Sequence, residues 1–151
     1  MKVQMDMVFT FEITTIPEHK ELRYYWAHLE GSLAISVDNV LFFEESDICL
    51  IELANDMHNW LLSGKLNTQP DFIYKTVDYY LEPILIFEYI NDDYYKIESI
   101  WQKTELTQLV SKISIITAFE TFLKNLEIEL AQKLTINLNE LLRNLNQEEE
   151  N

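Results

Sequence analysis

The sequence predicts an α+β protein with a mostly antiparallel sheet, and three observations support this class. Apolar and polar residues alternate near the N-terminus and again around residue 35, which is typical of half-buried strands. A tyrosine-rich block over residues 72–102 also has the composition of strands. Apolar residues recur at helical spacing in the middle of the chain and in its last third. The resulting order is a strand, a hairpin, a helix, a three-stranded meander and a helical end, as in α+β proteins.

The N-terminal segment is predicted to be a strand. The odd-numbered residues from Met5 to Ile13 are apolar and fall on one face, and Pro17 ends the alternation. Residues 18–30 fit a helix as well as a strand, so both interpretations remain open there.

The next predicted element is a β-hairpin. Alternation resumes after Gly31 and continues to Val37. Asp38 and Asn39 tolerate the backbone of a tight two-residue turn, so residues 40–43 are expected to return as the partner strand.

The middle of the chain predicts one helix. Apolar residues repeat at helical spacing from Leu50 to Leu61. Ser46 or Asp47 is expected to cap the free amides at the start of this helix. Gly64 is expected to end it, because glycine accepts the left-handed conformation found there.

Three further strands are predicted over residues 72–80, 84–90 and 94–102. Pro83 precedes the second strand, where its missing amide hydrogen does least harm. The Asn-Asp-Asp sequence at 91–93 is typical of the turn that joins the second strand to the third.

The chain from Leu106 onward contains neither glycine nor proline and is predicted to be helical. One apolar stripe runs from Ile115 to Leu130 and another from Leu134 to Leu145, with a weak stretch at 135–137 between them. Two helices, or one long helix with a break, explain this pattern equally well. These helices and the middle helix are expected to pack against the sheet.

Length and composition indicate a single domain over residues 1–151, since the chain has a mass of 18.0 kDa and is 48% hydrophobic. We expect a core of about 3–131, a C-terminal helical extension of about 134–147 and an acidic end at 148–151. The single cysteine suits a reducing compartment. No N-terminal basic segment precedes an apolar run, and no stretch is apolar over the length needed to cross a bilayer. We therefore expect a cytoplasmic protein that does not enter a membrane.

The charge of the chain restricts its partners. There are 26 acidic residues against 11 lysines and arginines, a net charge of −15, and the acids are spread along the whole length. Such a charge favours a cationic partner. It argues against nucleic acid, because binding its phosphates requires clustered lysine and arginine side chains. Two glycines are too few for a phosphate-binding loop, and the three histidines and one cysteine lack metal-ligand spacing. We therefore expect no cofactor, no metal and no catalytic residue, and hence not an enzyme.

Two acidic pairs are candidates for binding. Glu44 and Glu45 are adjacent on a predicted strand, so they should face opposite sides and not converge on one site. Asp92 and Asp93 suit a turn, where aspartate bonds to its own backbone. Solvated acids at a strand end and in a turn are therefore the simpler interpretation of both pairs.

The tyrosine-rich block is the other candidate. The doublets Tyr79-Tyr80 and Tyr94-Tyr95 cannot place both rings in the core on a two-residue period. At least one tyrosine of each should therefore lie on the outer face of the sheet or under a helix. Exposed tyrosine beside carboxylates is typical of a surface that binds a basic protein. Packing within the sheet explains the same residues, and both interpretations remain open.

Four segments together resemble a known group of proteins. They are LEGSLAISVDNVLFFEE, LANDMHNWL, PILIFEYINDDYYKIESIWQ and AFETFLKNLEIEL. Their layout over residues 5–131 is similar to that of the WapI-like immunity proteins of bacterial polymorphic-toxin systems. The resemblance implies a protein that neutralises a basic toxin domain by binding it directly, with no catalytic residue to carry over.

On this basis we expect a non-catalytic protein-binding module, either a monomer or a homodimer, whose partner is a basic protein. The residues expected to bind it are Glu44, Glu45, Asp47, Asp92, Asp93, Tyr94 and Tyr95. Two alternatives remain. One is a regulatory or scaffold protein that self-associates through its terminal helices, and the other is a small-ligand domain with a cleft lined by Tyr74, Glu88 and Trp101.

Overall fold

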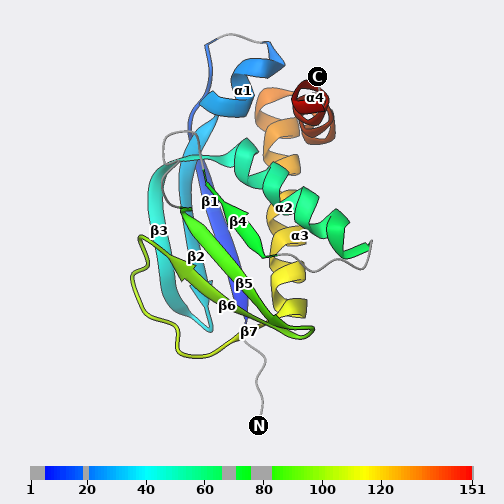
Figure 1. The fold of residues 1–151 in the computed structure, drawn as a ribbon. Helices are drawn as coiled ribbons and strands as arrows, with labels where there is room; N and C mark the ends of the chain where they lie inside the picture. The colour runs from blue at the N-terminus through cyan, green and yellow to red at the C-terminus, as the bar shows by residue number, and fades with distance from the viewer. Residues whose placement is uncertain (1–5, 19–20, 66–70, 76–82, 151) are drawn as a thin grey trace.

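The computed structural model describes residues 6–18, 21–65, 71–75 and 83–150, and Figure 1 shows its fold. In chain order the elements are β1 (Met7–Thr15), α1 (Leu22–His28), β2 (Glu30–Val37), β3 (Val40–Cys49), α2 (Leu50–Lys65), β4 (Phe72–Tyr74), β5 (Leu85–Asn91), β6 (Tyr94–Ser99), β7 (Val110–Ser111), α3 (Lys112–Glu129), a π-helical segment (Leu130–Leu134) and α4 (Leu138–Glu150). The predictions made for residues 3–5, for 76–80 with Tyr79 and Tyr80, and for 151 lie outside the described residues.

The strands form two antiparallel sheets. The first has the order β1-β2-β3 and the second the order β4-β5-β6-β7. The predicted α+β class and antiparallel pairing are therefore confirmed, with the strands divided between two sheets. In Figure 1, α2 and α3 lie to the right of the strands, and α4 lies beside α1 at the top of the molecule.

The first sheet contains the predicted N-terminal strand and hairpin. Asp38 and Asn39 have φ angles of 50° and 68°, as in the two-residue turn whose central residues are both left-handed. The backbone N–H of Asp6 donates a 2.7 Å hydrogen bond to Asp38 Oδ1, which ties this turn to the start of β1. The turn chemistry predicted from the sequence is confirmed.

The predicted start of the middle helix is wrong. β3 continues past Ser46 and Asp47 to Cys49, and α2 begins at the next residue. A register shift in the pairing of β3 with β2 lets the ladder continue this far, and Asp47 takes a left-handed φ of 59° within the irregular stretch. Gly64 lies inside the last turn of α2 and not after it.

A second register shift in β3 explains the burial of two adjacent rings. Phe42 and Phe43 are both fully buried, although adjacent residues of a regular strand face opposite sides. The pairing of β2 with β3 shifts between Ile35 and Ser36, directly opposite these residues. A bulge at this position turns both rings to the core side.

In the second sheet, β5 lies within one residue of its predicted bounds, whereas β6 is shorter than predicted. β6 ends at Ser99, and the part of β4 that the structure describes ends at Tyr74. The two-residue strand β7 was not predicted, and it pairs Val110 with Tyr95 and Ser111 with Tyr94. A strand of this length contains no alternation that a sequence pattern could detect.

The C-terminal region forms two helices with a break at the predicted place. α3 passes into the π-helical segment, which ends where Thr135 adopts a left-handed conformation with φ 56° and ψ 40°. The N-terminus of α4 is capped by Asn137, whose Oδ1 accepts a 2.9 Å hydrogen bond from the backbone N–H of Glu140. At the start of α3, Ser111 Oγ accepts a hydrogen bond from the N–H of Ser114 in the same way.

Both sheets and two helices meet around Phe119 of α3. Its ring centroid lies 5.7 Å from that of Phe9 in β1, 5.3 Å from that of Trp60 in α2 and 4.7 Å from that of Phe72 in β4. The ring of Phe87 in β5 is 5.8 Å away. These edge and tilted ring contacts are favourable, so Phe119 connects the cores of the two sheets.

Candidate functional site

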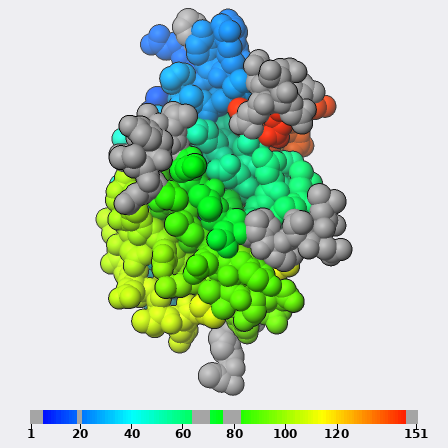
Figure 2. Space-filling model, viewed as in Figure 1, coloured from blue at the N-terminus to red at the C-terminus, as the bar shows by residue number. Residues whose placement is uncertain are grey.

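The second sheet turns one face to the core, and no described helix lies over the other. The buried side chains of its long strands are Phe72, Tyr74, Leu85, Phe87, Tyr95 and Ile97. The register places on the opposite face Ile73, Ile86, Glu88, Lys96 and Glu98. We call this second set the outer face. In the space-filling view of Figure 2, the strands of this sheet form much of the front surface of the molecule, and no helix of the described chain lies over them.

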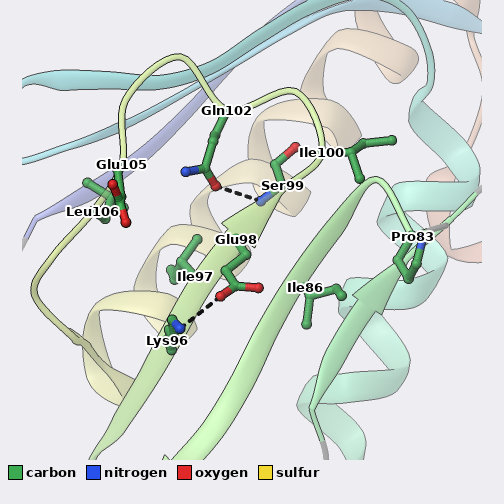
Figure 3. A pocket seen from close by; sticks show the side chains of 10 residues that line it. All are labelled: Pro83, Ile86, Lys96, Ile97, Glu98, Ser99, Ile100, Gln102, Glu105 and Leu106. Atoms are coloured by element: carbon green, nitrogen blue, oxygen red, sulfur yellow. Dashed lines mark hydrogen bonds and ion pairs between the residues drawn. The ribbon is translucent and has the colours of Figure 1, made fainter.

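The outer face is hollowed where β6 leads into the segment of residues 100–109 (Figure 3). The hollow has a volume of about 320 Å³. Its lining residues are Pro83, Ile86, Lys96, Ile97, Glu98, Ser99, Ile100, Gln102, Glu105 and Leu106. The strands β5 and β6 form its floor, and the segment 100–109, which we call the roof segment, runs beside β6 and borders the hollow on one side.

The charges of the hollow are arranged around one lysine. Lys96 Nζ lies 2.9 Å from Glu98 Oε1, and Glu88 is its direct partner across the β5–β6 ladder. The hydrogen bond to Glu98 raises the pKa of Lys96 above its ordinary value, and the negative charges of Glu98, Glu88 and Glu105 act in the same direction. Among the described lining residues, Lys96 is the single cation, and Glu98 and Glu105 are the two anions.

Hydrogen bonds hold the roof segment in place at its start. Ser99 Oγ donates to the carbonyl of Ile84 at 2.7 Å and accepts from the N–H of Trp101 at 3.0 Å. The N–H of Ser99 donates to Gln102 Oε1 at 3.1 Å. Figure 3 shows the side chain of Gln102 reaching down from the roof toward β6.

The roof segment also attaches to the first sheet. The N–H of Lys103 donates a 2.7 Å hydrogen bond to the carbonyl of Phe42, and Thr104 Oγ1 donates a 3.2 Å hydrogen bond to the carbonyl of Leu41. Both acceptors belong to β3. The hollow therefore has a roof that is fixed to two different sheets.

The predicted residues at the β5–β6 turn lie at one end of the outer face. Tyr89 donates a 2.6 Å hydrogen bond from its hydroxyl to Asp92 Oδ1, and this bond raises the pKa of Tyr89. Asp92 and Asp93 are exposed and Tyr94 is half-buried, so all three are accessible to a partner.

Tyr95, in contrast, is fully buried. Burial raises its pKa to about 12, with smaller contributions from Tyr89, Asp71 and Asp92. The prediction that one tyrosine of this doublet faces outward is confirmed. The inward one belongs to the core, so we do not expect Tyr95 to touch a partner directly.

The predicted residues Glu44, Glu45 and Asp47 lie elsewhere, on β3 of the first sheet. Glu44 is exposed opposite Ala34, and Glu45 is half-buried opposite the buried Leu33. The two carboxylates therefore face opposite sides of the sheet, as predicted. Figure 1 shows β3 at the left edge and the β5–β6 turn at the lower right, so the two predicted groups do not form one site.

Sequence reasoning missed the residues of the hollow. Lys96 and Glu98 are two positions apart on a predicted strand, and this spacing could have shown that they share a face. Glu105 and Leu106 belong to an irregular segment, and no periodicity in the sequence places them over β6.

The cleft predicted for a small ligand is not formed by its predicted residues. Tyr74 is fully buried, and its hydroxyl donates a 3.5 Å hydrogen bond to the carbonyl of Cys49. Neither Tyr74 nor Glu88 nor Trp101 lines the hollow.

The described residues contain neither a candidate metal cluster nor a helix that could cross a membrane. In this part of the chain no three side chains of histidine, cysteine, aspartate or glutamate are placed to share a metal ion. Among the described helices, none has the length and apolarity needed to span a membrane.

Comparison with known proteins gives one match. The model of a family described as a domain of unknown function (DUF7878) matches residues 5–132. No curated protein and no solved structure matches the chain. The match ends within the π-helical segment, so α4 lies beyond it.

Proposed function

We propose that this chain, which belongs to the DUF7878 family, is a non-catalytic module that binds a basic protein, and that it acts as an immunity protein against a basic toxin domain. The observation that carries the proposal is the outer face of the second sheet, over which no described helix lies. This face combines exposed apolar side chains with carboxylates, and it is hollowed at one end and bordered by aspartates at the other.

The composition of this surface suits protein binding. Ile73 on β4 and Ile100 beyond β6 are 45% and 43% exposed, so the outer face and its hollowed end offer apolar surface to a partner. Apolar side chains at the centre of a patch supply binding free energy, and a polar rim supplies orientation. The half-buried Tyr94 adds an aromatic anchor beside Asp92 and Asp93.

The net charge of −15 favours a basic partner. A negative field of this size accelerates the encounter with a positively charged protein and repels nucleic acid. In a toxin that acts on nucleic acid, the cationic groups that hold phosphate would pair with carboxylates of the outer face. The toxin would then be blocked because its substrate site is occupied. The resemblance to the WapI-like immunity proteins supports this class of partner.

The proposal is tested by co-expression with the basic domain encoded next to this gene. We expect the chain to restore growth of cells that produce that domain and to co-purify with it. Charge reversal by Asp92→Lys and Asp93→Lys should weaken the rescue, because both carboxylates border the outer face.

The matched control reverses two exposed acids on the C-terminal helices, Glu120→Lys and Glu140→Lys. This pair changes the net charge equally but leaves the outer face intact, so rescue should be affected less. Absence of both rescue and co-purification would overturn the proposal. An equal loss of growth rescue from the two pairs of charge reversals would mean that the net charge of the chain is responsible for binding, and not the outer face.

Self-association through the apolar stripe of α4 has little surface available. Leu138, Leu141 and Leu142 of α4 are buried, and α4 packs against α1 and α3 of the same chain. Light scattering after size-exclusion chromatography is expected to show a monomer in the absence of the partner.

A further inference from the structure

We propose that the hollow under residues 100–109 is a receptor for one arginine side chain of the partner. This inference rests on the proposed function, because it names the group through which a basic protein would be held. The hollow lies between the strands β5 and β6 and the roof segment, and both apolar and charged side chains line it.

The walls match the two parts of an arginine side chain. Pro83, Ile86, Ile100 and Leu106 supply apolar surface, against which the aliphatic stem of arginine packs while its charged end stays polar. Figure 3 shows Glu98 on the floor and Glu105 on the roof. A planar guanidinium has five donors and can bond to more than one carboxylate, whereas an ammonium acts as a single point charge.

Lys96 competes for the same carboxylate. In the structure its Nζ lies 2.9 Å from Glu98 Oε1, and this ion pair partly neutralises the negative charge of the hollow. Glu88 lies directly across the ladder from Lys96 on the same face. Lys96 can therefore form an ion pair with Glu88 when a guanidinium binds Glu98. With Glu88, Glu98 and Glu105 around one lysine, the site keeps a net negative charge.

The roof is already in place before binding. The hydrogen bonds of Ser99, Gln102 and Lys103 hold it to Ile84, to β6 and to β3. A site that needs no ordering loses less conformational entropy when it binds. An arginine is therefore expected to enter from the open side of the hollow without displacing residues 100–109.

The test uses three blocked amino acids as probes, namely N-acetyl-arginine methylamide, the citrulline analogue and the lysine analogue. Citrulline has nearly the shape of arginine without its charge. Titration of the isotope-labelled full chain, followed by NMR, should shift the amides of residues 96–106 with arginine, in the millimolar range. The citrulline and lysine analogues should give much smaller shifts.

Variants of the lining residues are expected to change the affinity for arginine in opposite directions. Glu98→Gln and Glu105→Gln should each weaken arginine binding about two- to fivefold, the range of a solvent-accessible ion pair. Lys96→Gln should strengthen it by a similar factor, because the competing cation is removed. The matched control Glu44→Gln removes one exposed carboxylate from the other sheet and should leave binding unchanged. The amide spectrum of each variant verifies that it is folded.

Three results would overturn the inference. They are shifts from citrulline equal to those from arginine, equal binding of the lysine analogue, and a loss from Glu44→Gln as large as that from Glu98→Gln. The outcome is separable from that of the proposed function. If the basic partner still co-purifies while arginine leaves residues 96–106 unshifted, only the receptor fails. If arginine binds as described but no partner rescues growth or co-purifies, only the proposed function fails.

Discussion

Thr135 holds the least favourable backbone conformation described in the structure. Its φ of 56° is left-handed, and a β-branched residue rarely adopts this region because its Cβ approaches the following carbonyl. The geometry is useful here, since the N–H groups of Thr135 and Ile136 both donate to the carbonyl of Leu130 and so end the π-helical segment. The strain is local and its removal should stabilise the protein.

The first prediction concerns this position. Thr135→Gly is expected to raise the free energy of unfolding by about 1 kcal/mol, because glycine accepts the left-handed conformation that ends a helix. Urea denaturation measures the change. Thr135 is exposed, so little packing is lost. Thr135→Ala serves as the control, since it retains the Cβ atom and should gain less; an alanine variant as stable as the glycine variant would contradict the explanation.

Two buried tyrosines lead to a prediction about alkaline pH. Burial raises the pKa of Tyr95 to about 12 and raises that of Tyr74 still further. A phenol whose pKa is higher in the folded than in the unfolded chain binds its proton more tightly when folded. Its contribution to stability is complete below the unfolded value of 10.0 and is lost as the pH rises through about 12.

We therefore expect the free energy of unfolding to fall steeply above pH 10. Ultraviolet absorbance of the phenolates should show one group of tyrosines ionising near the ordinary pKa and a second group ionising later, together with unfolding. Tyr95→Phe should reduce the amplitude of the late phase. A single ionisation step that precedes unfolding would contradict the assignment.

At the scale of elements, the helices and strands with regular apolar periodicity were predicted correctly, whereas local irregularities such as bulges were not. The alternation after Gly31 and the turn at Asp38 predicted the hairpin correctly. The helical spacing around Phe119 predicted α3, and the weak stretch at 135–137 predicted the break before α4. Each of these signals repeats over several residues, so one exceptional residue does not remove it.

The failures come from features that involve distant parts of the chain. The bulges in β3 depend on its pairing with β2, and they extend the strand past Asp47, where the sequence predicts a helix cap. The segment 18–30 stayed undecided because α1 covers only residues 22–28 and carries a single fully buried side chain, Tyr25. A helix of two turns is held in place by its neighbours more than by its own sequence.

The candidate site was half predictable for the same reason. The aspartates of the β5–β6 turn were identified because turn chemistry is local. The hollow depends on Glu105 and Leu106, which reach the outer face only because Lys103 and Thr104 bond to the distant strand β3. No spacing within the sequence contains this information.

α4 provides a prediction at the scale of an element. Leu141 is fully buried, and α4 packs against α1 and α3, away from the second sheet. Leu141→Ala should destabilise the protein by about 2–4 kcal/mol. Hydrogen exchange should become faster in α1 and α4 and remain slow in β5 and β6. Leu62→Ala is the matched control, because Leu62 is 43% exposed and its truncation should cost little. Faster exchange across the second sheet would contradict a local role for α4.

At the scale of the whole molecule, self-repulsion of the acids dominates the electrostatics. In the described ranges the ion pairs join exposed side chains, such as Lys124 to Glu127 and Lys133 to Glu129, and such pairs contribute little to stability. With 26 acids and 11 bases, most carboxylates have no cation to pair with. The folded chain is more compact than the unfolded one and therefore carries the greater repulsion.

Salt is accordingly expected to stabilise this protein. Raising NaCl from about 20 mM to about 500 mM shortens the range of the repulsion severalfold. We expect a gain of about 1 kcal/mol, which corresponds to ~2–4 °C in the melting temperature of a chain of this length. Calorimetry at the two salt concentrations measures the shift. A lower melting temperature in high salt would mean that attractive ion pairs outweigh the repulsion.

The attachment of residues 103–104 to β3 has a consequence for the solubility of the protein. β3 is the outermost strand of its sheet, and a bare outer strand offers its carbonyls and amides to a strand of another molecule. The roof segment occupies the carbonyls of Leu41 and Phe42, in a stretch where the exposed Val40 and Leu41 would otherwise favour aggregation. The residues that border the hollow therefore also cover part of this edge, and they protect the protein from pairing with its own copies through β3.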